Sequence, residues 1–235
     1  MTRLLSAMRT DVVLQARSRL YQIGIGVAVV LGIAARVFLD RDALGAALPI
    51  LILLGMGNTT YIFMAGMVLF EKSERTLDAV IVSPLPVHVY ILSKVVTLTA
   101  FATLETAILL VIGFGITGFN PWLLALGAFV VGAMYALTGL AQVVRYDSVT
   151  DFLMPGAVLV ALIPMLPILD VLRIWPSPVW YVVPAYPPLL IMTAAFTSIE
   201  TWQAVYAVGY SVLLLAGGSL LARRQFEKHI VRRGS

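Results

Sequence analysis

The 235-residue chain is 60% hydrophobic and only 12% charged, with a mean hydropathy of +0.97. Soluble domains carry about 25% charged residues, so this composition excludes an ordinary soluble domain and predicts an integral membrane protein. The chain has no cysteine, which excludes disulfides and thiolate metal sites, and its net charge of +4 is typical of basic cytoplasmic loops rather than of nucleic-acid binding.

The first 19 residues precede the first apolar run. Their apolar and polar side chains separate onto two faces of a helix, Leu4, Met8, Val12 and Ala16 against Arg3, Ser6, Arg9, Thr10 and Arg17. This pattern predicts a helix over 1–19 that lies in the membrane interface, with its arginines toward the lipid headgroups. The alternative is a loose basic tail that only sets the topology.

Six apolar runs are each close to or longer than the ~20 residues that cross a bilayer as a helix. They cover 20–39, 44–70, 89–119, 122–144, 152–172 and 202–222. A β-barrel would instead alternate in ten-residue segments, and these runs are continuous. The sequence therefore predicts an all-α integral membrane fold with six transmembrane helices.

The basic residues favour one orientation of these spans. With both termini cytoplasmic, the outer side holds only Arg36, Arg41 and Arg173, and the inner side holds Arg3, Arg9, Arg17, Arg19, Lys72, Arg75, Lys94, Arg145, Arg223, Arg224, Lys228, Arg232 and Arg233. Lysine and arginine accumulate on the cytoplasmic side of membrane proteins. We therefore expect a multi-pass protein of the plasma or inner membrane with both termini inside.

The outer segment 173–190, between the fifth and sixth spans, is rich in proline and aromatic residues. Its prolines forbid one continuous helix, and its tryptophans and tyrosines favour the headgroup zone. Short broken helices that dip into the outer leaflet satisfy both constraints, and a plain aromatic loop is the alternative.

Motifs of common enzyme sites are absent from the sequence. It has no G-x-x-x-x-G-K-[ST] phosphate-binding loop and no G-x-S-x-G turn, and its two histidines, His88 and His229, are far apart. A histidine-based metal site is not expected from that spacing. We therefore expect no catalytic residue, no metal and no cofactor in this chain.

A short charged segment, 71–83, separates the second and third spans and is followed by Pro84. Glu71 and Arg75 form a favourable i, i+4 pair worth about 0.3–0.5 kcal/mol, whereas Glu74 and Asp78 form an unfavourable one. The charges therefore do not serve to stabilise an isolated helix. A short amphipathic helix that offers a mixed-charge face to a partner is one interpretation, and a solvated loop is the other.

The run from Glu71 to Lys94 resembles the signature of ABC-2 type export permeases. The matching residues are Glu71, Thr76, Leu77, Ser83, Pro84, Leu85, Tyr90 and Lys94. The sequence departs from the pattern at Arg75 and Ser93, where glycine is usual. The six spans, the N-terminal helix and the outer segment resemble the family over the whole length, and by size the chain is most similar to compact permeases that export fluoroquinolones or other antibiotics.

This resemblance implies that the whole chain, 1–235, is one ABC-2 transmembrane domain without an ATPase site. Residues 71–83 would be its coupling helix, docked on a separate ATPase that carries ATP and magnesium. A second permease copy, identical or a sister chain, would complete the transporter. The residues expected at the ATPase are Glu71, Lys72, Glu74, Arg75, Thr76, Leu77, Asp78, Ser83 and Pro84.

Glu105 lies near the middle of the third span, where burying an acid costs at least a few kcal/mol unless it is paired or protonated. It either touches a cationic substrate in the pathway or fixes helix packing through hydroxyl partners. Asn58 and Thr59 of the second span sit at a similar depth and are candidate partners or pathway residues.

The function expected from these features is ATP-driven export of a drug-like or amphipathic substrate. Three alternatives stay open: an ABC-2 exporter of lipid or polysaccharide, a proton-coupled secondary transporter that uses Glu105, and a membrane scaffold whose charged segment recruits a cytosolic protein. The first two differ in substrate and in energy source. Only the scaffold transports nothing.

Overall fold

The computed structural model describes residues 2–77, 85–172 and 174–231, and these contain helices but no strand. The elements are α1 (Thr2–Arg17), α2 (Leu20–Phe38), α3 (Arg41–Leu51), η1 (Ile52–Met56), α4 (Gly57–Ser73), α6 (Val87–Gly113), α7 (Pro121–Val143), α8 (Val149–Val171), η2 (Pro178–Val182), α9 (Tyr186–Thr193), α10 (Thr201–Phe226) and η3 (Glu227–Val231).

Six helical stretches in the described residues are long and apolar enough to cross a membrane, which confirms the predicted all-α fold. They cover Leu20–Phe38, Arg41–Ser73, Val87–Gly113, Pro121–Val143, Val149–Val171 and Thr201–Val231. The third is shorter than the predicted 89–119, because the chain turns after Gly113 through Gly115 and Gly118, whose φ angles are +102° and +93°. These left-handed conformations suit glycine and cannot continue a helix.

Several helices begin where side chains accept hydrogen bonds from the otherwise unpaired backbone N–H groups of the first turn. Asn120 Oδ1 accepts from Trp122 and Leu123 at the start of α7, and Ser148 Oγ accepts from Asp151 at the start of α8. Glu200 forms a reciprocal capping box with Gln203 at the start of α10. Local sequence therefore sets where these three spans enter the membrane.

The second span, Arg41–Ser73, is one continuous helical unit composed of α3, η1 and α4. Pro49 lies inside α3, and the π-helical turn η1 follows it directly. Single π-helical turns are rare and often occur at functional sites. This turn sets the direction in which the first residues of α4, including Asn58 and Thr59, project into the bundle.

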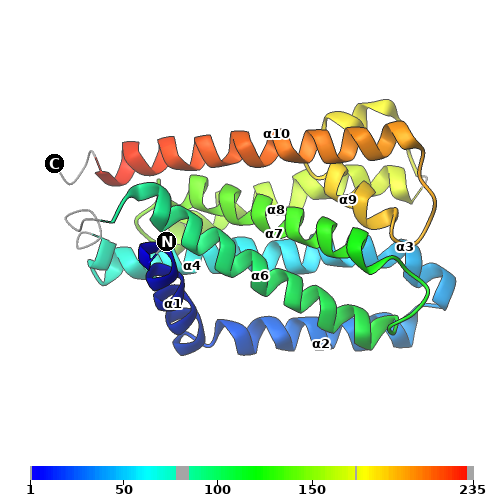
Figure 1. Ribbon diagram of the computed structural model, residues 1–235, viewed down its shortest axis with the longest axis horizontal. Coiled ribbons are helices and arrows are strands. Elements are labelled where there is room, and N and C mark those ends of the chain that lie inside the picture. Colours follow the sequence, from blue (N-terminus) through cyan, green and yellow to red (C-terminus); the bar gives the residue numbers. More distant parts are fainter. Residues whose placement is uncertain (1, 78–84, 173, 232–235) are drawn as a thin grey trace.

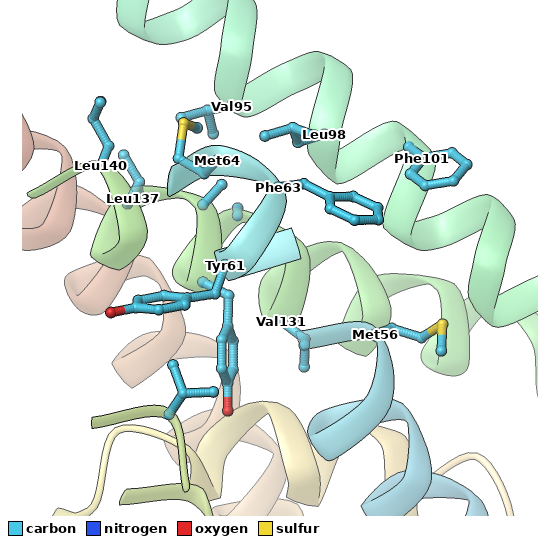
Figure 2. Close-up of a cluster of buried hydrophobic side chains, with 14 of the residues drawn as sticks. Met56, Tyr61, Phe63, Met64, Val95, Leu98, Phe101, Val131, Leu137 and Leu140 are labelled. Carbon is cyan, nitrogen blue, oxygen red and sulfur yellow. The ribbon is translucent and has the colours of Figure 1, made fainter. Parts of the chain in front are cut away.

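The core lies around α4, which packs against α6 and α7. Figure 2 shows Phe63 of α4 beside Phe101 of α6, with their ring centroids 6.3 Å apart, and Met64 beside Val95. Met64 and Val68 are fully buried. Helix α4 is therefore surrounded by protein for most of its length.

Helix α1 crosses the end of the bundle at which α10 and η3 finish (Figure 1). It packs on α6, and its buried face carries Asp11 and Gln15, whereas Leu5, Val12 and Val13 are exposed. The helix was predicted, but its contacts with α6 were not: Asp11 and Gln15 face α6, Leu4 and Met8 are partly buried, and Val12 and Ala16 are exposed. Polar partners on α6 draw Asp11 and Gln15 inward and leave apolar residues outward, toward the lipid expected at an interface.

The outer segment forms two short helices, as predicted. The 3-10 helix η2 begins at Pro178, and α9 begins with Tyr186 and two prolines. The whole first two turns of α9 are buried against α7 and α10. The α9 part of the segment is therefore folded back into the bundle, whereas most of η2 remains exposed, with only Trp180 buried.

Candidate coupling and substrate sites

A buried ion cluster joins three helices at the end of the bundle that α1 crosses, which we call the α1 end. Lys94 Nζ of α6 lies 2.8 Å from Asp11 Oδ1 of α1 and 2.5 Å from Glu71 Oε1 of α4. Buried charges are tolerated only when paired and hydrogen-bonded. One lysine here serves two carboxylates that are far apart in sequence.

The remaining carboxylate oxygens of this cluster also have donors. Tyr90 Oη donates to Glu71 Oε2 and Ser93 Oγ donates to Asp11 Oδ2, both at 2.5 Å. Every carboxylate oxygen in the cluster therefore accepts a hydrogen bond, which is the condition for such a network to be stable. The position of Ser93, where the resemblance expects glycine, supplies one of these donors.

The network extends along α1 toward α2. Gln15 Nε2 donates to Thr97 Oγ1 of α6 at 2.9 Å, and Tyr21 Oη of α2 donates to Gln15 Oε1 at 2.7 Å. Helices α1, α2, α4 and α6 are therefore tied together at one end of the bundle by buried polar contacts.

Lys72 attaches the end of α4 to the connection between α7 and α8. Its Nζ donates to the carbonyl oxygens of Val144 and Tyr146 at 3.0 and 2.6 Å, and it pairs with Asp147 at 3.3 Å. A lysine that binds the last carbonyls of a helix also interacts favourably with its dipole. The two loops at the α1 end are thus linked through α4.

The residues expected at an ATPase separate into two groups in the structure. Glu71 and Leu77 are buried and point into the protein, whereas Glu74, Arg75 and Thr76 are exposed. Asp78, Ser83 and Pro84 lie outside the described residues. Glu71–Ser73 form the last turn of α4, and the helix breaks at Glu74–Arg75. The separate helix that was expected from Glu71 therefore does not begin there.

Arg75 causes this break by its backbone conformation. Its φ is +56°, in the left-handed region that costs a non-glycine residue about 1–2 kcal/mol. The glycine that the resemblance expects at this position would adopt the turn without that cost. The chain therefore changes direction at Arg75, directly after the end of α4.

We expect Arg75→Gly to stabilise the protein by about 0.5–1 kcal/mol, because glycine relieves the left-handed strain. Arg75→Val should destabilise it, since a β-branched residue is disfavoured at positive φ. Thermal unfolding of the two variants in detergent measures both effects. A lower unfolding temperature for Arg75→Gly than for the parent would contradict this account.

Glu105 is completely buried in the middle of α6, and it meets Thr59 as the sequence suggested. Thr59 Oγ1 lies 3.1 Å from Glu105 Oε2 and 3.0 Å from the Met56 carbonyl oxygen. The other carboxylate oxygen, Oε1, has no hydrogen-bond partner among the described residues. One oxygen of this carboxyl group is therefore buried against α2 near Gly24 without a hydrogen-bond partner in the described parts of the chain.

Asn58 is not brought into hydrogen-bonding contact with Glu105. Its Oδ1 is buried and has no hydrogen-bond partner in the described parts of the chain. Thr60 instead donates to the Met56 carbonyl oxygen at 2.8 Å. Asn58 Oδ1 on α4 and Glu105 Oε1 on α6 are therefore two of the buried polar atoms that have no hydrogen-bond partner within the described residues.

A cavity of about 770 Å³ lies at the α1 end, between α1, α4 and the start of α6. Its walls are mostly apolar. The lining includes the ion cluster together with Arg3, Ser6, Ala7, Thr10, Leu14, Gly66, Met67, Phe70 and Leu85. The volume lies in the range of small-molecule sites.

Sequence reasoning missed Asp11 and the inward role of Lys94. Asp11 is the only acidic residue before Asp40, and Lys94 falls within an apolar run. A lysine inside a span requires a carboxylate partner, so this requirement was the signal that could have indicated a buried pair.

The fold and these contacts define a multi-pass membrane protein whose charged loops are tied to its central helices. The chain belongs to the fluoroquinolones export permease protein family, which it matches over residues 2–234. It is 28% identical to the fluoroquinolones export permease protein of two Mycobacterium tuberculosis strains, H37Rv and CDC 1551, over 99% of this chain and 98% of the relative. No solved structure matches the chain.

Proposed function

We propose that this chain is the permease subunit of an ATP-driven ABC exporter that moves a drug-like, amphipathic substrate out across the membrane. Its membership of an export permease family over nearly the whole length carries this proposal. ATP and magnesium would be held by a separate ATPase subunit, and a second copy of the chain or a sister permease would complete the pathway. Both termini would be cytoplasmic, which places the α1 end inside the cell.

The exposed segment around Glu74, Arg75 and Thr76 is the proposed contact with the ATPase. It follows α4 directly, and α4 is held to α6 and α1 through Glu71 and Lys94. Because these helices share one buried joint, a displacement of the segment would move them together. The exposed residues would therefore contact the ATPase, and the buried Glu71 and Lys94 would transmit the movement to the other helices.

Charge reversal tests the coupling proposal. Glu74→Lys, alone and with Asp78→Lys, should abolish co-purification with the proposed ATPase subunit and should abolish export, with unchanged permease in the membrane. Asp42→Lys reverses another exposed acid at the opposite end of the second span and serves as the matched control. Intact association and export in the double variant, or export in cells without the ATPase, would overturn the proposal.

Glu105, Asn58 and Thr59 are the proposed pathway residues. Glu105→Gln keeps the size of the side chain and an acceptor for Thr59, but it removes the acid. We expect normal membrane levels and a fall of about tenfold in export of a cationic substrate, because a buried carboxylate is the group a cation would require. Unchanged export of that substrate would remove Glu105 from the pathway.

The free oxygen of Glu105 also favours a second candidate, proton-coupled secondary transport. The two functions differ in their energy source. Export by the ABC mechanism would stop on ATP depletion while the proton gradient is held, whereas a secondary transporter would stop when a protonophore collapses the gradient. Measuring both conditions in the same vesicles decides between the two.

A further inference from the structure

The cavity at the α1 end combines an apolar wall with a charged floor. Leu14, Met67 and Phe70 supply much of the wall, and the floor is made by Asp11, Glu71 and Lys94. An apolar pocket with a few convergent polar groups is the usual form of a small-molecule site. Its volume of about 770 Å³ suits a drug-sized ligand rather than an ion.

The floor presents negative charge to the cavity. The Lys94 side chain is 1% exposed, whereas those of Asp11 and Glu71 are 8% and 10% exposed. The ammonium group is thus covered, whereas the two acidic side chains keep a slight exposure. Two carboxylates against one ammonium also leave one negative charge uncompensated within the floor.

These carboxylates retain capacity to bind a ligand. Each oxygen has two lone-pair directions, and each accepts one hydrogen bond from Lys94, Tyr90 or Ser93. Arg3 also lines the cavity, but it is exposed, so water and salt screen its charge more than they screen the floor. A cation seated on the floor therefore meets attraction in a site of low dielectric.

We propose that this cavity binds a drug-sized amphipathic amine cation, with the ammonium on Asp11 and Glu71 and the apolar body against α4 and α1. That the substrate enters this cavity from the inner leaflet rests on the proposed function and on the proposed orientation of the chain. Exposed Phe70 and Gly66 border the cavity on α4, where a membrane-dissolved molecule would arrive. The deeper Glu105 site would then be a later position on the route.

Gly66 allows the cavity to be filled without disturbing the ion cluster. A Cβ at Gly66 would meet no atom within 4 Å, so Gly66→Leu should fold normally and occupy the space. Gly26, on α2, also has no neighbour within 4 Å and does not line the cavity. Gly26→Leu is therefore a matched control with the same change of side chain.

The test measures binding of norfloxacin, which carries a protonated amine at neutral pH, to the purified full chain in phosphatidylcholine nanodiscs. We expect Gly66→Leu to raise Kd about tenfold or more and Gly26→Leu to change it by less than about twofold. The N-acetyl derivative, which lacks the cation, should bind the parent protein about tenfold more weakly. Thermal unfolding of both variants should match that of the parent.

Equal Kd values for the two leucine variants, or equal Kd values for norfloxacin and its N-acetyl derivative, would overturn the proposal. Loss of a co-purified phospholipid in Gly66→Leu with unchanged norfloxacin binding would assign the cavity to lipid instead. The assay contains no ATPase, so its result is independent of coupling. If norfloxacin binding depends on Gly66 but the permease does not co-purify with an ATPase in the coupling experiment, the cavity proposal stands. Only the ATP-driven mechanism is then refuted.

Discussion

Lys94→Met should lower the free energy of unfolding by about 3–5 kcal/mol, the largest loss we expect from a single conservative truncation in this chain. Lys94 is buried between Asp11 and Glu71, and its ammonium group pairs with both carboxylates. Removing the ammonium group leaves two buried carboxylates close together, and their only remaining hydrogen-bond donors in the cluster are the hydroxyl groups of Tyr90 and Ser93. Thermal unfolding in detergent micelles measures the loss, and Lys228→Met, at an exposed lysine, supplies the baseline.

Neutralising the acids as well should restore most of this stability. In the triple variant Asp11→Asn, Glu71→Gln and Lys94→Met, no charge remains to be paired, and buried ion clusters can often be replaced at little cost. The amides still accept from Ser93 and Tyr90. If the triple variant is no more stable than Lys94→Met alone, the loss does not come from unpaired charge.

The membrane spans could be predicted because a continuous apolar run of about 20 residues matches the length of helix that crosses the hydrocarbon core of a bilayer. The errors occurred at the ends of the spans, where composition carries less information than backbone geometry. The third span was expected to reach Phe119 because residues 114–119 are still apolar in part. Gly115 and Gly118 end it earlier through positive φ angles.

The polar joint at the α1 end could not be predicted from local spacing. Periodicity along 1–19 separated the apolar from the basic residues, but it holds no information on the facing helix, and α6 presents Lys94 and Thr97 there. The same limit affected Glu71. Its neighbour at i+4, Arg75, was considered as a partner, whereas the folded chain brings Lys94 and Tyr90 to it.

The contact between Thr59 and Glu105 was within reach of the sequence, because both residues lie near mid-depth in consecutive spans and a buried acid needs a donor. Asn58 has the same depth and makes no such contact. Its direction depends on the π-helical turn at Ile52–Met56, which shifts the phase of the following helix. No propensity argument anticipates that turn.

Gly24→Ala should destabilise the protein by about 1–3 kcal/mol, because the added methyl group would overpack a closed site. A Cβ at Gly24 would lie 1.9 Å from Glu105 Oε1 and 2.7 Å from the nearest ring atom of Phe101. Glu105 can yield only by leaving Thr59, and Phe101 is held by Tyr21, whose ring centroid is 4.6 Å away. Thermal unfolding should show the loss, whereas Gly26→Ala on the same helix should be close to neutral.

A double-mutant cycle identifies the source of this loss. Glu105→Ala removes the carboxylate that the new methyl group would meet, so Gly24→Ala should cost measurably less in that background, with a coupling of about 0.5–3 kcal/mol. Phe101 stays in place in both backgrounds and accounts for the remainder. If the losses from Gly24→Ala and Glu105→Ala simply add in the double variant, Glu105 Oε1 does not lie against Gly24. The oxygen assigned to the pathway would then not lie at the contact between α2 and α6.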